Sequence, residues 1–427
     1  MGAIMRNKFL SGFLSGLAGA LIIFTIALTI FVVRPNGKDD NAGSNRINNA
    51  GINRINNAEA AAKTEDEEYQ RKVLQKIKKI ETLIDHYYLE DVNEEAIADG
   101  IYKGILQSLG DPYSTYYTKA EYKSLMESSS GIYCGIGATV TKDVTTGIIS
   151  IVTPFVTGPA YEVGILPGDI IYKVEGKEVT GLDLTEVVSR IKGEEGTKVK
   201  VAIVREGESE PLEFSIPRRI VEVPTITYEM LDGKIGYIAI SEFDEVTAQQ
   251  FRDAITELDK QGQKGLIVDI RNNPGGLLNT VSDMLDRMLP KGLIVYTKDK
   301  YGNREEKKSD GKEEFNKPLV VLINGNSASA SEIFAGAIQD YGKGTIVGTT
   351  SFGKGIVQSI IPLQDGTAIK VTVSKYFTPK GQDIHGVGIK PDVTVELKDE
   401  LKRKVIIKKE DDNQLQKAIE IIKEKIK

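Results

Sequence analysis

The sequence of residues 319–341 is LVVLINGNSASASEIFAGAIQDY, and this stretch determines the kind of fold that the chain can adopt. Residues 319–324 form a short apolar run suited to a buried strand, and small residues follow it. A helix is expected over Ser331–Tyr341, directly after those small residues. This order would present a serine hydroxyl at a helix N-terminus, where free N–H groups and the helix dipole favour negative charge. Taken alone, the serine cluster fits a simple helix cap equally well.

The residues around this stretch alternate apolar runs with helical patterns. Gly265–Ile270 is a second run typical of a buried strand. Helices are expected near Thr247–Gln261 and Leu277–Leu289, between or after the two strands. Residues 220–395 are therefore predicted to form an α/β domain.

The N-terminal region predicts a membrane anchor. Residues 9–33 contain no charged side chain, and at about 1.5 Å per residue they exceed the roughly 30 Å hydrocarbon thickness of a bilayer. The run is longer than the apolar part of a cleaved signal peptide, and no Ala-x-Ala-like site follows it. Basic residues lie on both sides of the run, so their count does not decide the orientation. The short tail and the long following region favour a cytoplasmic tail and an exported body.

Composition excludes several kinds of chemistry. The 427 residues contain one Cys and two His, which is too little for an internal disulfide or a Cys- or His-rich metal site. The formal net charge is -6, and removing residues 1–35, which hold three basic and no acidic side chains, leaves -9. A body that acidic, with no basic stripe, argues against a nucleic-acid partner. No metal and no cofactor are expected.

The middle of the chain closely resembles a PDZ domain. Residues 158–176 read GPAYEVGILPGDIIYKVEG, and Gly135-Ile136-Gly137-Ala138 stands where PDZ domains have their carboxylate-binding loop. Glycines let successive backbone N–H groups converge on a terminal carboxylate, while an extended peptide adds to a sheet edge. Gly135, Ile136 and Gly137 are therefore expected to bind a peptide. Cys134, beside this loop, is expected to be a half-buried strand residue and not a reactive thiol.

Four separated motifs closely resemble the carboxy-terminal processing (tail-specific) serine proteases, peptidase family S41. Besides residues 319–341 they are SFGKGIVQ at 351–358, IRNNPGGL at 270–277 and GDPYS at 110–114. The resemblance covers roughly residues 70–395 and implies an α/β (α+β) core related to the Clp protease and crotonase folds. It also implies a helical N-terminal subdomain before the inserted β-rich PDZ domain.

The resemblance assigns roles to individual residues. Ser329 matches the nucleophile, Lys354 the general base, and Gln358 the residue that orients the lysine. Backbone N–H groups of Gly275 and Ala330 match the oxyanion hole. Gly276 competes with Gly275 for the first of these two roles, and Asp340 matches a supporting acid or is an ordinary surface carboxylate.

The lysine can serve as a base only in its neutral form. Its pKa must therefore fall from about 10.4 towards 7–8, which corresponds to roughly 4 kcal/mol and which burial can supply. A Ser329–His385 pair is the alternative that spacing leaves open, although a structural loop histidine is the simpler interpretation.

These inferences combine into one hypothesis. We expect a membrane-anchored, exported serine endopeptidase that recognises protein C-termini through its PDZ domain. The sequence does not decide whether it forms a homodimer. The alternatives are a non-catalytic PDZ scaffold and a crotonase-type acyl-CoA enzyme, and the Ser–Lys pair argues against both. The expected segments are a tail and anchor (1–35), a flexible spacer (36–64), a helical subdomain (65–127), the PDZ domain (128–219), the protease core (220–395) and a C-terminal helical tail (396–427).

Overall fold

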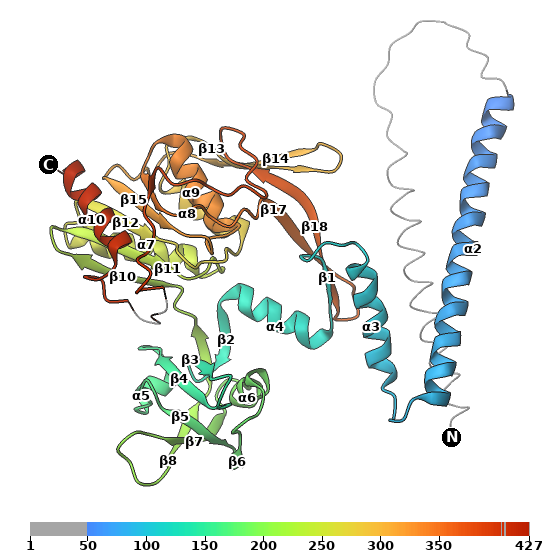
Figure 1. Cartoon of the computed structure of the whole chain (residues 1–427), viewed down its shortest axis with the longest axis horizontal. Helices are drawn as coiled ribbons and strands as arrows, with labels where there is room; N and C mark the ends of the chain where they lie inside the picture. Colours follow the sequence, from blue (N-terminus) through green and yellow to red (C-terminus); the bar gives the residue numbers. More distant parts are fainter. Residues whose placement is uncertain (1–48, 403, 405–406, 427) are drawn as a thin grey trace, which may run out of the picture. The chain divides into compact units, whose positions relative to one another are not determined.

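The computed structural model describes residues 49–402, 404 and 407–426 (Figure 1). The chain divides into two compact units, Met1–Val92 and Asn93–Lys427. The expected membrane anchor at residues 9–33 lies outside the described residues. None of the helices in the described part combines the length and the apolar character that a membrane span requires.

The first unit contains a single long helix in its described part, α2 (Asn49–Tyr87). The expected helical subdomain starts at residue 65, whereas α2 starts at Asn49, so the interpretation of residues 49–64 as a flexible spacer is wrong. The alanines of this segment, which favour helix more than any other residue type, account for the earlier start. The rest of the expected spacer, residues 36–48, lies outside the described residues. Several large apolar side chains of this helix are exposed: Tyr69, Val73, Ile80, Leu83 and Tyr87.

The second unit begins with two capped helices, α3 (Glu94–Gln107) and α4 (Lys119–Ser130). Asn93 caps α3 by accepting two backbone N–H groups, and Thr118 forms a capping box with Glu121 at the start of α4. The short strand β1 (Thr115–Tyr117) lies between the two helices and pairs with β18. This pairing brings the GDPYS motif, which precedes β1, to the C-terminal half of the chain.

The β-rich middle of the chain folds around its own apolar core. Its six-stranded sheet has the order β3-β4-β5-β7-β8, and β6 pairs with β5. Strand β3 therefore forms one edge of the sheet, which is the position where a peptide strand could be added. The elements are β3 (Ala138–Lys142), β4 (Ile149–Pro154), α5 (Pro159–Glu162), β5 (Ile170–Val174), β6 (Lys177–Glu178), α6 (Leu184–Ile191), β7 (Lys198–Val204) and β8 (Leu212–Pro217). The two-stranded ribbon of β2 (Ile132–Gly135) and β9 (Arg219–Glu222) carries the chain into and out of this module.

The α/β domain after the β-rich module is built on a second six-stranded sheet with the order β10-β11-β12-β15-β16-β19. Strands β11 to β19 of this order run parallel, and β10 adds to β11 antiparallel. Because the ends of neighbouring parallel strands meet at one edge, the loops after β12 and β15 come together. The strands are β10 (Ile226–Leu231), β11 (Ile235–Ile240), β12 (Gly265–Asp269), β15 (Leu319–Ile323), β16 (Thr345–Gly348) and β19 (Val393–Thr394).

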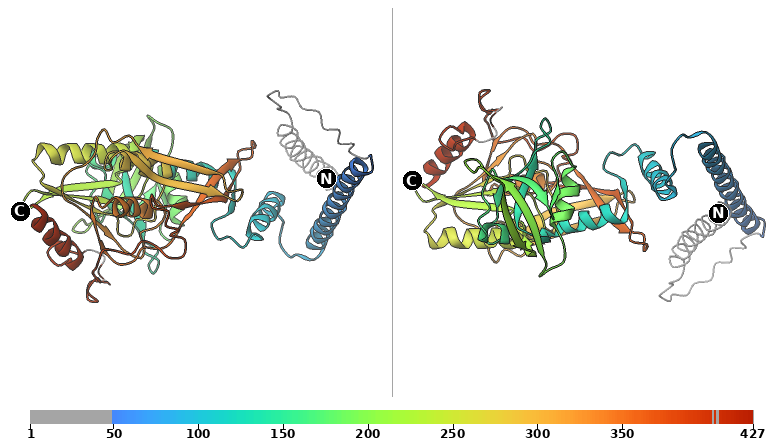
Figure 2. Two further views of the ribbon diagram at one scale, coloured as in Figure 1. Left: turned by 90° about the horizontal axis from the view of Figure 1, so that it is seen from above. Right: turned by 90° about the horizontal axis from the view of Figure 1, so that it is seen from below.

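Helices cover both faces of this sheet (Figure 2). Alternate residues of each strand point to opposite faces, so Val321 packs in the larger core while Val320 and Leu322 pack in the smaller one. The larger core lies under α7 (Thr247–Lys260), α8 (Leu278–Asp286) and α9 (Ala330–Tyr341). The smaller core lies under the C-terminal helix α10 (Asn413–Ile426).

A third sheet contains two antiparallel hairpins, β13–β14 and β17–β18. Its order is β1-β18-β13-β14, with β17 pairing along β18. The strands are β13 (Gly292–Asp299), β14 (Arg304–Ser309), β17 (Ile356–Pro362) and β18 (Ala368–Phe377). The expected fold class, an α/β protease core with an inserted β-rich module and helices before it, is confirmed for the described residues.

Candidate active site

Ser329 lies at the tight turn between β15 and α9 and has a strained backbone. Its φ and ψ angles are 55° and -114°, outside the region that residues other than glycine commonly adopt. Such strain costs of the order of 1–3 kcal/mol and persists only where surrounding structure enforces it. The conformation places Ser329 at the start of α9, where the N–H of Ala330 makes no hydrogen bond to a described residue.

The loop after β12 approaches Ser329 through Gly275. A Cβ atom on Gly275 would lie 2.8 Å from Cβ of Ser329 and 3.0 Å from the backbone nitrogen of Ala330, so only glycine fits. The φ angle of Gly275, 110°, also excludes larger residues without strain. The two loops therefore meet at the point where Ser329 would meet a substrate carbonyl.

The hydrogen bonds of this loop distinguish its two glycines. The N–H of Gly275 donates to Oδ1 of the fully buried Asn273 across 2.8 Å. The neighbouring residues pair with Phe243, since Phe243 donates to the Gly275 oxygen and Leu277 donates to the Phe243 oxygen. The N–H of Gly276 makes no hydrogen bond to a described residue. Gly276 and Ala330 thus have backbone N–H groups without a partner among the described residues, and Gly275, which precedes Gly276, lies against Ser329.

Buried polar contacts connect the two loops. The carbonyl of Asn273 accepts the N–H of Ala328 and the hydroxyl of Ser331, at 3.0 and 2.9 Å. The buried hydroxyl of Ser327 donates to the carbonyl of Ile270 at 2.8 Å. The turn at Ser329 and the loop after β12 that carries Gly275 and Gly276, here called the glycine loop, are therefore joined by buried hydrogen bonds.

Glu332 connects the Ser329 turn with the loop that carries Lys354. Its side chain is fully buried and accepts the backbone N–H groups of Ser329, Gly353 and Lys354 at 2.9, 2.7 and 2.8 Å. It also accepts the hydroxyl of Ser351 at 2.6 Å. A single carboxylate therefore fixes the backbone on both sides of the site.

Tyr376 makes a second connection between the same two segments. Its hydroxyl lies 2.9 Å from the carbonyl oxygen of Ser329 and 2.5 Å from that of Lys354. Burial raises the pKa of Tyr376 well above its ordinary value, so the phenol keeps its proton and remains a donor.

Lys354 precedes β17 and extends towards the GDPYS motif. Its Nζ lies 4.6 Å from the ring centre of Tyr113. Burial lowers the pKa of Lys354, and the positive charge of Lys370 lowers it further, whereas Asp111 and Glu332 act in the opposite direction. No hydrogen bond joins Nζ of Lys354 to Oγ of Ser329, although both residues are described.

Gln358 does not contact Lys354 directly. Its amide nitrogen lies 3.5 Å from the hydroxyl of Thr372, and that hydroxyl donates to the Asp111 carboxylate at 2.6 Å. Asp111 also accepts the hydroxyl of Ser114 at 2.6 Å. The hydrogen bonds that start at Gln358 therefore end at Asp111, and the charge of Asp111 raises the pKa of Lys354.

The side chains of the two remaining predicted residues make no hydrogen bond to Ser329, and all of these residues are described. Asp340 is eleven residues further along the chain, which is about 16 Å along a helix. Its carboxylate accepts the backbone N–H of Lys380 at 2.7 Å, a structural role. His385 is exposed, and its backbone packs against Gly355, so its ring takes no part in these contacts.

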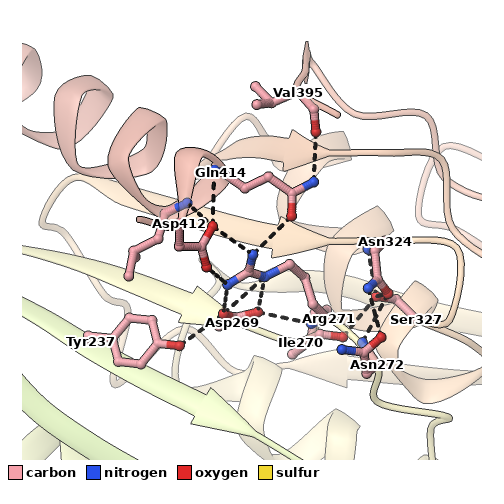
Figure 3. Close-up of polar contacts among 11 residues, drawn as sticks. Tyr237, Asp269, Ile270, Arg271, Asn272, Asn324, Ser327, Val395, Asp412 and Gln414 are labelled. Atoms are coloured by element: carbon pink, nitrogen blue, oxygen red, sulfur yellow. Dashed lines mark hydrogen bonds and ion pairs between the residues drawn. The ribbon is translucent and has the colours of Figure 1, made fainter. Parts of the chain in front are cut away.

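Arg271 at the end of β12 connects the glycine loop to the C-terminal segment (Figure 3). Its guanidinium binds the carboxylates of Asp269 and Asp412 at 2.6 and 2.8 Å and the amide oxygen of Gln414 at 2.9 Å. Tyr237 donates to Asp269 from the other side at 2.9 Å. Burial lowers the pKa of Arg271, but the carboxylates of Asp269 and Asp412 raise it by more, so the guanidinium remains a cation.

The expected peptide-binding loop borders an apolar pocket between β3 and α6. The pocket has a volume of about 260 Å³ and includes Tyr133, Ile136, Ala138, Phe155 and Ile191 among its lining residues. Ile136 is buried, and its carbonyl accepts the N–H of Ala160 at 2.7 Å. Gly135 and Gly137 flank it, and a Cβ on Gly137 would lie 2.9 Å from Cα of Gly158. Cys134 is half-buried in β2, and burial raises its thiol pKa, as expected of an unreactive strand residue.

Sequence reasoning missed Glu332, Tyr376 and Asn273 as parts of the site. Glu332 follows Ser329 by three residues, which is the spacing of a capping box, and this spacing suggested only a helix cap. Its contacts with Ser351, Gly353 and Lys354 depend on the tertiary fold.

Comparisons with protein families match three segments of the chain. Peptidase family S41 matches residues 234–395, a PDZ domain matches residues 151–205, and the N-terminal domain of the activating protease CtpB matches residues 42–121. The S41 segment contains Ser329, Lys354 and the glycine loop, and the PDZ segment lies within the β-rich module.

Individual proteins resemble the chain over most of its length. The carboxy-terminal processing protease CtpA of Bacillus subtilis is 42% identical over 313 residues, which cover 73% of this chain and 66% of the relative. The carboxy-terminal-processing protease of Bartonella bacilliformis is 39% identical over 317 residues, covering 72% of each chain. Among solved structures, the photosystem II D1 C-terminal processing protease is 32% identical, with a TM-score of 0.44, covering 74% of this chain and 86% of that one.

Proposed function

The chain belongs to peptidase family S41, the carboxy-terminal processing serine proteases, and we propose that it cleaves proteins by a Ser329–Lys354 mechanism after recognising their C-termini. The observation that supports this proposal best is the double connection between the two residues. Glu332 accepts the backbone N–H of both, and the Tyr376 hydroxyl lies within hydrogen-bond distance of both carbonyl oxygens. Such a connection suits two side chains that must act on one another.

In this mechanism neutral Lys354 removes the proton of Ser329 as Oγ attacks the substrate carbonyl carbon. The developing oxyanion accepts hydrogen bonds from Ala330 and a glycine N–H, and the lysine then gives its proton to the departing amine. Water, deprotonated by the same lysine, releases the acyl group from Ser329. Burial of Lys354 supports this role, because it lowers the pKa and so raises the neutral fraction.

Gly276 is the better proposal for the glycine donor. The Gly275 N–H is already engaged with Asn273, whereas the Gly276 N–H is free. Gly275 would instead serve by its lack of a side chain, which leaves room beside Ser329.

The absence of a Ser329–Lys354 hydrogen bond fits a resting arrangement. Lys354 is close to the Tyr113 ring, and activation would then require its Nζ to move towards Ser329. We infer that peptide binding to the PDZ module drives this change, as it would couple substrate recognition to catalysis.

A proteolysis assay tests the proposed function. The detergent-solubilised full chain, incubated with an unstructured protein, should cleave it, whereas Ser329→Ala and Lys354→Ala should lose at least about 1,000-fold in rate. Asp340→Asn keeps a side-chain oxygen that can accept the Lys380 N–H, and it should retain activity. Undiminished cleavage by either alanine variant would refute the dyad. No cleavage by the parent protein would favour a binding scaffold or acyl-CoA chemistry instead.

C-terminal recognition has its own test. Peptides with a free C-terminal carboxylate should stimulate cleavage more than their amidated counterparts, because only the carboxylate is anionic at its end. The free edge of β3 and the pocket beside α6 support this part of the proposal. Equal stimulation by the free-acid and the amidated peptides would contradict C-terminal recognition.

Residues 9–33 are proposed to anchor the protein in the cell membrane, with the catalytic body on the extracytoplasmic side. The support is the uncharged apolar run in the sequence. Protease protection in sealed vesicles and the mass of the mature chain would test topology and cleavage.

A homodimer through α2 is the proposed assembly. The support is the exposed apolar side chains along that helix, including Tyr69, Ile80 and Tyr87. Light scattering of the purified chain should give twice its mass, and Ile80→Glu should give the monomer.

A further inference from the structure

The turn at residues 111–114, within the GDPYS motif, is held against strand β18. Asp111 accepts the N–H of Tyr113 at 3.0 Å and the hydroxyl of Ser114 at 2.6 Å, which closes the turn. Thr372 of β18 donates its hydroxyl to Asp111 at 2.6 Å and its N–H to the Ser114 hydroxyl at 3.1 Å. Strand β1 follows the turn directly and also pairs with β18. The position of Tyr113 beside this strand is therefore well defined.

The ring of Tyr113 binds the end of the Lys354 side chain. Nζ of Lys354 lies over the ring, 4.6 Å from its centre, within the roughly 6 Å over which an aromatic face attracts a cation. This nitrogen has no hydrogen-bond acceptor and no ion-pair partner among the described residues, so the ring is the contact that holds it. Burial, and then the charge of Lys370, lowers the pKa of this lysine, while Asp111 and Glu332 raise it.

The contact with the ring is selective for the charged form of the lysine. An aromatic face attracts a cation through its quadrupole, and a neutral amine lacks the charge. The proposed mechanism needs Lys354 neutral and within reach of the Ser329 hydroxyl. The contact with Tyr113 therefore opposes catalysis in two ways, because it favours the charged state of the lysine and a position away from the serine.

We propose that the ring of Tyr113 binds Lys354 in its protonated form and holds its Nζ away from Ser329, which makes Tyr113 a positioning residue that restrains the base. This inference rests on the proposed function, because it takes Lys354 to be the base that acts on Ser329. The hydrogen bonds that define the turn and the 4.6 Å contact between the nitrogen and the ring carry it.

Two substitutions separate the ring from the rest of the side chain. Tyr113→Leu removes the ring but keeps an apolar group beside Lys354, so the nitrogen stays shielded from water while the attraction is lost. Tyr113→Phe keeps the ring and should match the parent. Tyr301→Leu is the matched control, because Nζ of Lys300 lies 5.0 Å from the centre of the Tyr301 ring, in the turn between β13 and β14, where Tyr301 is 77% exposed.

The first measurement is the reactivity of Lys354 towards an amine-acylating reagent, which does not depend on proteolysis. Only a neutral amine reacts, so the labelling rate of the full chain across pH, followed by mass spectrometry of the Lys354 peptide, reports the protonation of this lysine. In Tyr113→Leu the pKa of Lys354 should fall by about 0.7 unit, so labelling below that pKa should be about 5-fold faster. Tyr113→Phe and Tyr301→Leu should label like the parent.

The second measurement is kcat/KM for an unstructured protein substrate across pH, with the detergent-solubilised full chain. The rising limb of the profile should move to lower pH by about 0.7 unit in Tyr113→Leu. At a pH where the lysine is already neutral, the variant and the parent should coincide. A loss of packing alone would instead lower the rate at every pH.

Two outcomes overturn the inference. Equal labelling of Lys354 in the parent and in Tyr113→Leu would show that the ring does not hold the ammonium group. A lower kcat/KM of Tyr113→Leu at every pH, with the rising limb unmoved, would make Tyr113 a support of the fold. If the labelling changes as expected but the parent cleaves nothing, the proposed function fails while the contact between Tyr113 and the ammonium group stands.

Discussion

The carboxylate of Glu332 accepts the backbone N–H of Lys354 across 2.8 Å, and the same carboxylate accepts the N–H of Ser329 at 2.9 Å. Ser329 and Lys354, the proposed nucleophile and base, lie on different loops, after β15 and before β17. Their relative position therefore depends on a fully buried acceptor that belongs to α9. This relationship is the structural reason to treat Ser329 and Lys354 as one unit.

Glu332→Gln should abolish most activity with a smaller effect on substrate affinity. The amide nitrogen cannot accept, so buried N–H groups lose their partner at about 1–3 kcal/mol each. We expect a loss of about 2–4 kcal/mol in unfolding free energy and of about 100-fold in kcat, because small misplacements of reacting groups are costly. Chemical denaturation and steady-state kinetics would measure both. The exposed Glu245→Gln is the control, and a Glu332→Gln protein with the parent's kcat would show that this carboxylate does not position the dyad.

Much of the fold follows from local sequence. The apolar runs predicted β12 and β15 to within one residue, and the small-residue turn predicted the start of α9. These elements could be predicted because a buried parallel strand is apolar on both faces. The prediction of a flexible spacer over residues 49–64 was wrong, because this Asn- and Ala-rich segment resembles a linker in composition but has enough alanine to form helix.

The site was less predictable than the fold. Motifs place Ser329, Lys354 and the glycine loop, but they do not say which glycine N–H is free, since that depends on where the Asn273 side chain points. The hydroxyl of Tyr376 contacts the carbonyl oxygen of Ser329, although the two residues are 47 positions apart in the sequence. Contacts of this kind arise only when β18 packs beside the Ser329 turn, and no local spacing indicates them.

The pH dependence of catalysis should shift in opposite directions in two variants. In the proposed mechanism Lys354 acts in its neutral form, so activity should increase as the pH increases through its pKa. Lys370 lowers the pKa of Lys354, after burial, and Asp111 raises it. Lys370→Gln should move the rising limb of kcat/KM to higher pH, and Asp111→Asn should move it to lower pH.

Lys375→Gln is the control for these shifts, because Lys375 is on the same strand but pairs with Asp383. Profiles of kcat/KM against pH for the four proteins provide the measurement. Shifts of the same sign in Lys370→Gln and Asp111→Asn would mean that the titrating group is not Lys354.

Asp412→Ala should weaken both the fold and catalysis. Asp412 is buried, binds the Arg271 guanidinium and accepts the N–H groups of Gln414 and Leu415 at the start of α10. Removing one partner of a buried ion pair costs roughly 3–5 kcal/mol, and Asp269, which stays, reduces that to about 2 kcal/mol. The glycine loop follows Arg271 directly, so kcat should fall as well.

The adjacent Asp411→Ala is a close control, since Asp411 is exposed. Thermal unfolding and kcat would be measured side by side for both variants. If Asp412→Ala behaves like Asp411→Ala in both measurements, the C-terminal segment does not support the loop.

Asp244→Asn should change how stability depends on pH. Asp244 is 6% exposed in the loop beside Phe243, and its carboxylate accepts no hydrogen bond from a described residue. Burial, and then the charge of Glu242, raises the pKa of Asp244 from 3.8 to about 7. The folded state therefore holds a proton that the unfolded chain releases at lower pH, so stability falls as the pH increases from about 4 to about 7 and is constant above.

An asparagine has no such proton, so the variant should melt close to the parent at the acidic end and above it from about pH 7 upward. Differential scanning calorimetry across this range, with the exposed Asp253→Asn on α7 as control, would reveal the divergence. Parallel melting curves for parent and Asp244→Asn at every pH would mean that Asp244 is ionised in the folded protein, and its burial would then require a cationic partner.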